Sequence, residues 1–175
     1  MESLKTLDTI SQEELGLQLD PNHFMEFLKA EDQDIEGNYE IDCVGMCEFA
    51  CLYIGMMLTD SELPGKLSLV SGKAGWGGHF WVEHFWVEYT LEGQTYIIDL
   101  TLRQFIPEAT NLIVSKSRGS VYKSYTKSGQ GQPMTEYLEQ VKAFEFYIDP
   151  RTMTKPVGHM TEKQILSILR SKFIS

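Results

Sequence analysis

Residues 79–101, HFWVEHFWVEYTLEGQTYIIDLT, limit the folds that the chain can adopt. Valine, isoleucine, tyrosine, phenylalanine and tryptophan dominate this stretch, and these residue types are enriched in β-strands. Its only glycine, Gly93, follows Glu92, and a two-residue turn ending in glycine is typical of a β-hairpin. The stretch therefore predicts two antiparallel strands, 79–91 and 95–100, joined by that turn.

The pentapeptide HFWVE occurs twice in tandem, at 79–83 and 84–88. Its period is odd, whereas side chains along a strand alternate with a period of two. His79 and His84 therefore point to opposite faces of any regular strand that contains both. A bulge between the copies, or one copy lying outside the strand, would relieve this conflict.

The turn predicts which histidine meets a carboxylate. If two residues form the turn, Leu91 lies opposite Gln94. Counting back along both strands places His84 and Asp99 on one face as diagonal neighbours, with backbones about 7–8 Å apart. That distance suits a hydrogen bond between an imidazole and a carboxylate. A turn of odd length would instead select His79.

The most apolar segment, DCVGMCEFACLYIGMML at 42–58, predicts a buried central helix too short to span a bilayer. Gly45 permits a sharp turn into this helix, which leaves Cys47 in the first helical turn. A helix N-terminus favours the thiolate form of cysteine, which is the nucleophilic form. Cys51 would lie one turn deeper, in the core, and Cys43 in the entering loop.

The whole chain, 1–175, has the length of a single domain. We expect a loose lead-in at 1–10, a helix at 21–31, a strand at 66–71 and a closing helix at 161–173. Helices come first and strands cluster in the middle of the sequence. This order predicts an α+β fold in which a central helix carrying the cysteine packs on an antiparallel sheet carrying histidine and aspartate.

The charge and the apolar pattern exclude some partners. The net charge is −10, and an acidic surface disfavours nucleic acids and anionic membranes. No apolar run of about 20 residues is present, and the N-terminal residues lack the apolar stretch of a signal peptide. We expect a cytoplasmic protein, or an effector secreted by a route without such a signal. Three cysteines, four residues apart, do not form a disulfide framework.

Three short motifs occur in a meaningful order: Gly-Met-Cys at 45–47, His-Phe-Trp-Val-Glu at 84–88 and Asp-Leu-Thr at 99–101. This order resembles the transglutaminase-like branch of the papain-like cysteine superfamily. Members of that branch show a Gly-x-Cys helix start, a His-x-Trp-x-Glu strand, and Asp-x-Thr about fifteen residues after the histidine. The sequence LRQF at 102–105 is similar to the tail of bacterial papain-fold toxins and deamidases.

The resemblance implies a catalytic triad with Cys47 as nucleophile, His84 as general base and Asp99 as the group that orients the histidine. Two positions depart from the family pattern. Cys51 stands where alanine or serine is usual, and Leu100 replaces the usual proline, which leaves the strand end less fixed.

The implied function is amide processing through a thioester, without a cofactor or a metal. The favoured activity is protein glutamine deamidation or transglutamination, in a bacterial effector or toxin. The substrate would be a protein or peptide with a glutamine or other amide side chain. A cysteine protease of the same fold and an inactive binding module remain alternatives. A zinc site built from the three cysteines is a third alternative, although their spacing is not the usual one.

Other polar residues are candidates for the same site. Cys43 is the alternative nucleophile and His79 the alternative base. Asn38 is a candidate donor to the oxyanion, in addition to backbone N–H groups near the nucleophile. His23 and His159 have no chemical context in the sequence and are expected at the surface.

Overall fold

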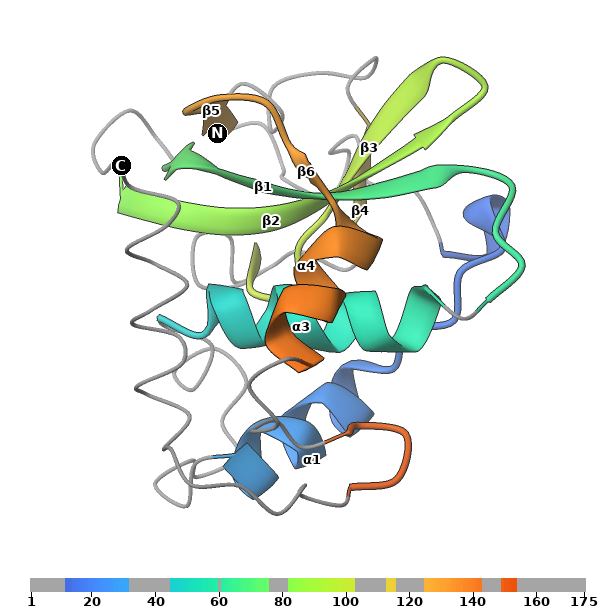
Figure 1. The fold of residues 1–175 in the computed structure, drawn as a ribbon, viewed down its shortest axis with the longest axis vertical. Helices are drawn as coiled ribbons and strands as arrows, with labels where there is room; N and C mark the ends of the chain where they lie inside the picture. Colours follow the sequence, from blue (N-terminus) through green and yellow to red (C-terminus); the bar gives the residue numbers. More distant parts are fainter. Residues whose placement is uncertain are drawn as a thin grey trace, which may run out of the picture.

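The structure, a computed structural model, describes residues 12–31, 45–59, 61–75, 82–102, 113–115, 125–142 and 149–153. Within these residues, three α-helices and one 3₁₀ turn accompany a six-stranded sheet (Figure 1). The helical elements are η2 (Glu13–Leu15), α1 (Pro21–Glu31), α3 (Cys47–Leu58) and α4 (Met134–Lys142). The strands are β1 (Lys66–Ala74), β2 (Val82–Leu91), β3 (Gln94–Ile98), β4 (Ile113–Ser115), β5 (Tyr125–Lys127) and β6 (Gln132–Pro133). The predicted α+β class with an antiparallel sheet is confirmed.

The sheet runs in the order β4-β3-β2-β1-β5, and β6 also pairs with β1. Each of these pairs is antiparallel. β2 lies in the middle of the order, between β1 and β3. Its residues are buried on both faces from Trp86 to Tyr89, which explains why this strand lacks a simple alternation of polar and apolar residues.

The β2–β3 hairpin has the predicted register. Leu91 pairs with Gln94, so the turn consists of Glu92 and Gly93 alone. Both turn residues have positive φ angles, 50° and 80°. Positive φ at both central residues defines the type I′ turn, whose twist matches that of antiparallel strands. The last pair is Val87 with Ile98, and the chain continues from there directly to the polar segment at 99–101.

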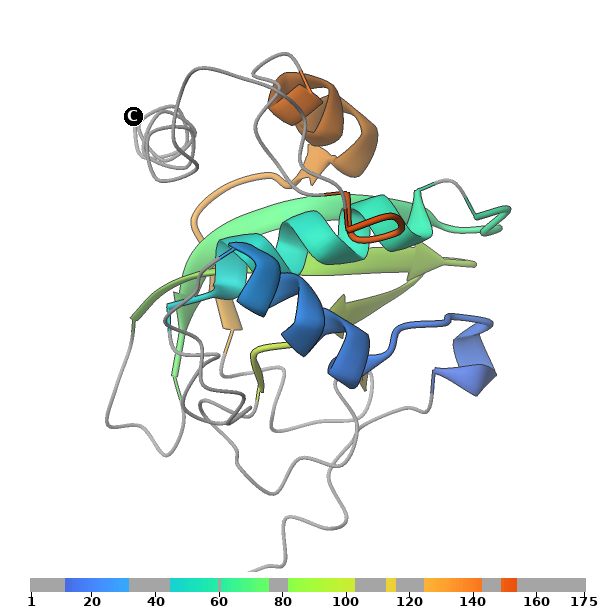
Figure 2. The same ribbon diagram turned by 90° about the horizontal axis from the view of Figure 1, so that it is seen from below.

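The helices form layers on the sheet. In Figure 1, α3 lies below the sheet and α1 lies below α3, and Figure 2 shows the same sequence of layers from another side. α3 contacts β2, α1 and α4, and it is therefore the central helix. Removing apolar side chains from water drives this packing. The largest fully buried side chains are Trp86, Tyr53, Tyr89, Phe24, Phe27, Leu28, Ile54, Ile97, Ile98, Leu100 and Leu102.

Local sequence explains where two helices begin. Pro21 occupies the first position of α1, where its missing N–H is harmless, and Asp20 Oδ1 accepts the N–H of Asn22 at 2.8 Å. Ahead of α3, Gly45 adopts φ +77°, a conformation that favours glycine. The chain turns there and the helix begins at Cys47, as predicted.

Several expectations change in detail or are untested. The strand predicted at 66–71 extends to Ala74. The first hairpin strand is described from Val82, so the expected start at 79 lies outside the described residues. The lead-in at 1–10 and the closing helix at 161–173 also lie outside them. Among the helices in the described part of the chain, none has both the length and the apolarity needed to cross a membrane.

Candidate active site

A buried ion pair lies where β2 and β3 diverge. His84 Nε2 is 2.8 Å from Asp99 Oδ2, and the two side chains are only 2% and 1% exposed. Extending the hairpin register by one residue places Trp86 opposite Asp99, so His84 is its diagonal neighbour on the same face. The contact predicted from the two-residue turn is therefore confirmed.

Further donors hold the Asp99 carboxylate. Oδ1 accepts the backbone N–H of Thr101 at 2.8 Å and its hydroxyl at 2.7 Å. Oδ2 accepts the Tyr125 hydroxyl at 2.7 Å, in addition to the His84 imidazole. Four hydrogen bonds thus surround this buried carboxylate, which matches the acceptor capacity of its ionised form.

These contacts set the protonation of the pair. Burial alone would lower the pKa of His84, but the charge and hydrogen bond of Asp99, with a contribution from Cys47, raise it from 6.5 to about 10. Burial alone would raise the pKa of Asp99, because it disfavours the charged carboxylate. The His84 charge and the hydrogen bonds from His84, Tyr125 and Thr101 outweigh burial and lower it below 3.8. At neutral pH the pair is therefore imidazolium and carboxylate.

Cys47 approaches the same imidazole from the start of α3. Cys47 lies close enough to His84 for its side chain to contribute to the raised pKa of the imidazole. Because Asp99 uses Nε2, the nitrogen left to face the sulfur is Nδ1. Cys47 is 9% exposed, more than either His84 or Asp99.

Cys51 lies one turn deeper in α3 and is 1% exposed, as expected for a core residue. Burial, followed by the charges of Cys47 and Asp99, raises the pKa of its thiol well above 9.0. Cys51 therefore stays protonated at neutral pH.

Aromatic rings enclose the imidazole. The centroid of His84 lies 6.2 Å from the Trp86 ring and 6.0 Å from the Tyr125 ring. The Trp86 and Tyr125 rings pack edge to face at 5.1 Å. Two residues further along β2, the buried Glu88 pairs with Lys127 of β5 at 2.5 Å. The rings exclude water from the ion pair, which strengthens it.

The remaining candidate residues are not brought into this site by the described part of the chain. Cys43, His79, Asn38 and His159 lie outside the described residues. Within the ranges that the structure describes, no group of three or more His, Cys, Asp and Glu side chains is placed to hold a metal ion. The zinc alternative involves Cys43 and stays untested.

The sequence reasoning missed Tyr125 and the role of Thr101. Thr101 had a signal, since it belongs to the Asp-Leu-Thr motif and its hydroxyl and N–H both bind Asp99. Tyr125 had none, because β5 pairs with β1, a strand far away in the sequence.

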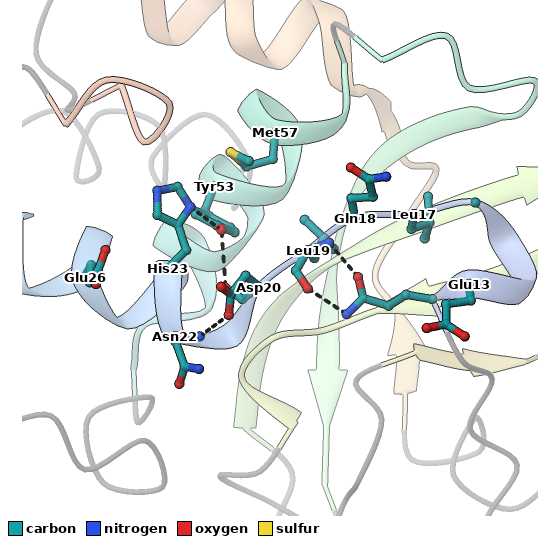
Figure 3. A pocket seen from close by; sticks show the side chains of 12 residues that line it. Glu13, Leu17, Gln18, Leu19, Asp20, Asn22, His23, Glu26, Tyr53 and Met57 are labelled. Carbon is teal, nitrogen blue, oxygen red and sulfur yellow. Dashed lines mark hydrogen bonds between the residues drawn. The ribbon is translucent and has the colours of Figure 1, made fainter.

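A separate cavity of about 870 Å³ lies beside α1 (Figure 3). His23 Nδ1 is 2.8 Å from the Tyr53 hydroxyl, which donates to the Asp20 carbonyl at 3.3 Å. His23 is half-buried, and the Tyr53 hydroxyl is a polar partner that the sequence did not indicate. The cavity is lined by Gln12, Glu13, Gly16, Leu17, Gln18, Leu19, Asp20, Asn22, His23, Glu26, Tyr53 and Met57.

Comparison of the chain with family models, curated proteins and solved structures gave no match. The interpretation of the site therefore depends on its own residues and their geometry.

Proposed function

We propose that the protein is a cysteine-dependent amide-processing enzyme with Cys47 as nucleophile, His84 as acid and base, and Asp99 as the orienting carboxylate. The observation that carries this proposal is the buried His84–Asp99 ion pair, with a cysteine beside the imidazole at the start of a helix. Clustered buried ionisable groups with strongly shifted pKa values are typical of active sites. The transglutaminase-like resemblance of the three motifs supports the same roles.

The chemistry would proceed in two halves. In the first, the Cys47 sulfur attacks an amide carbonyl carbon, a C–S bond forms, and the carbonyl electrons move to oxygen. The C–N bond then breaks as His84 gives its proton to the leaving nitrogen, which leaves a thioester. In the second, water or an amine attacks the thioester, His84 takes its proton, and the C–S bond breaks to regenerate the thiolate.

The start of α3 would stabilise the oxyanion. The first N–H groups of any α-helix have no acceptor within the helix. In α3 the Ala50 N–H donates to the Met46 carbonyl at 2.9 Å. The backbone N–H of Cys47, at the first position of the helix, is the proposed oxyanion donor.

The proposed substrate is a glutamine or other amide side chain of a protein or peptide, and the favoured reaction is deamidation or transglutamination. An effector or toxin role rests on the resemblance of residues 102–105 to the tail of bacterial deamidases. Peptide-bond hydrolysis is the alternative within the same chemistry. A glutamine-containing peptide separates them, since deamidation releases ammonia and leaves the peptide intact.

Alkylation with iodoacetamide tests the nucleophile. We expect one thiol of the folded protein to react rapidly at pH 6, where an ordinary cysteine with a pKa of about 8.5 reacts slowly. Cys47→Ala should abolish this reaction and His84→Ala should move it to higher pH, because the imidazolium is lost. Peptide mapping by mass spectrometry identifies the labelled residue. Cys43→Ala is the matched control and should keep the rapid reaction. Rapid labelling that survives Cys47→Ala, or slow labelling of every thiol, would contradict the proposal.

A further inference from the structure

Tyr125 reaches the candidate active site from β5, which β1 and β2 separate from β3 and Asp99. β5 pairs with β1, whereas Asp99 directly follows β3, so β1 and β2 lie between the two backbones. The Tyr125 hydroxyl nevertheless donates to Asp99 Oδ2 at 2.7 Å, and its ring lies against both His84 and Trp86. The side chain therefore passes over the imidazole and contacts the carboxylate behind it.

A glycine makes this approach possible. Gly72 of β1 pairs with His84 on one side and with Lys127 on the other. A Cβ atom at this position would lie 2.1 Å from the Thr126 carbonyl oxygen and 2.8 Å from Cη2 of Trp86. Any larger residue would push β5 away from β1, and Tyr125 with it.

The hydroxyl of Tyr125 and the imidazole of His84 share one oxygen. Oδ2 of Asp99 accepts from both, at 2.7 and 2.8 Å, while the Thr101 donors occupy Oδ1. A second donor on the same oxygen withdraws negative charge from it. The carboxylate then holds the imidazolium proton less strongly than it would with His84 as its only partner there.

The other ionisable groups near His84 are placed differently. Cys47 of α3 lies beside the imidazole, whereas Glu48 of the same helix acts on the pKa of Cys51. On the face of β2, the charge of Glu88 is balanced by Lys127. Of the groups in the described part of the chain, Tyr125 alone donates to the oxygen that His84 uses.

We propose that Tyr125 is a positioning residue that acts through Asp99. Its hydroxyl orients the carboxylate and reduces the negative charge on Oδ2, which lowers the proton affinity of the His84 imidazole. The imidazolium, whose Nε2–H stays on Oδ2, can then give its Nδ1 proton more readily to the leaving nitrogen. This inference rests on the proposed function, because only an acid–base role makes the proton affinity of His84 matter for turnover.

Tyr125→Phe removes the hydroxyl and keeps the ring. We expect the pKa of His84 to rise by about 0.5 unit, measured by NMR titration of labelled histidine, because Oδ2 then serves the imidazole alone. The alkaline limb of the pH profile for ammonia release should move up by the same amount. Tyr89→Phe is the matched control, since Tyr89 is a buried sheet tyrosine whose oxygen accepts the Gly65 N–H, away from Asp99. It should leave the pKa of His84 unchanged.

A purely structural tyrosine gives the opposite sign, since a loosened carboxylate would lower the pKa of His84. An unchanged or lower value in Tyr125→Phe therefore overturns the inference. If that variant does not fold, Tyr125→3-fluorotyrosine keeps the shape and strengthens the donor. Burial and the neighbouring Asp99 raise the pKa of Tyr125 well above 10, so the fluorinated hydroxyl stays protonated at neutral pH. The pKa of His84 should then fall, and an unchanged value overturns the inference.

The NMR measurement separates this inference from the proposed function. A shifted His84 pKa in a protein that never acylates Cys47 would defeat the enzyme proposal and leave the coupling of Tyr125 to His84 intact. Acylation with no shift in Tyr125→Phe would defeat the positioning role alone.

Discussion

Two histidines of this molecule each lie beside a hydroxyl or a carboxylate, and the two pairs differ in what surrounds them. His84 meets the Asp99 carboxylate in a place where both side chains are almost fully buried. His23 meets the Tyr53 hydroxyl at 2.8 Å beside an open cavity, next to the exposed Asp20. The distances are the same, but only one of these pairs joins two opposite charges that are excluded from water.

The difference shows why cavity size alone is a poor guide to chemistry in this chain. The cavity at His23 has room for a ligand, yet the described residues that line it include no cysteine or serine. The His84 site instead combines a thiol, an imidazole and a carboxylate. In a buried setting these groups interact strongly, because the effective dielectric constant is low.

Removing each imidazole in turn should give the largest difference between the two pairs. His84→Ala should reduce ammonia release from a glutamine peptide by about 10²–10⁴-fold, the usual contribution of a general acid and base. His23→Ala should leave the rate unchanged, because His23 lines the separate cavity beside α1. Steady-state kinetics measures both, with circular dichroism as the control for folding. An equal loss of rate in His23→Ala would show that the two histidine pairs act together.

Neutralising the carboxylate gives the next effect in size. Asp99→Asn should lower the pKa of His84 substantially and destabilise the fold by about 3 kcal/mol, because one partner of a buried ion pair is lost. Chemical denaturation monitored by fluorescence measures the loss.

The pH dependence of stability follows from the same pair. The folded pKa of His84 is raised from 6.5 to about 10, so its stabilisation is complete below pH 6.5 and is lost as the pH rises through about 10. The folded pKa of Asp99 is lowered, so its share is present above pH 3.8 and is lost as the pH falls below that value. Wild-type stability should therefore decline between pH 6.5 and 10. A decline of the same size in Asp99→Asn would show that the ion pair is not its source.

The sequence predicted the part of the site that short-range geometry controls. The two-residue turn and the alternation of a strand were enough to pair His84 with Asp99. Gly45 was enough to place Cys47 at the start of α3, because a sharp turn before an apolar helix has few alternatives. Each inference needed only a few consecutive residues.

Contacts between distant strands could not be predicted in this way. Tyr125 reaches Asp99 only because β5 lies beside β1, and no short turn fixes the register of those two strands. The partner of His23 was missed for the same reason, since packing of α1 on α3 brings it to Tyr53. Such contacts depend on tertiary packing, which local patterns do not determine.

Tyr53→Phe should have the smallest effect and completes the comparison. The variant removes the hydroxyl that contacts His23 and donates to the Asp20 carbonyl, and it keeps the ring, which packs against Phe24 and Phe27. We expect a loss of about 1 kcal/mol in the free energy of unfolding, the net value of a neutral hydrogen bond, since water at the cavity can replace the lost partner. The loss should not change between pH 6.5 and 10, unlike the effect of Asp99→Asn. Urea denaturation at several pH values measures it, and a loss as large as that of Asp99→Asn would show that the cavity pair is as tightly coupled as the ion pair.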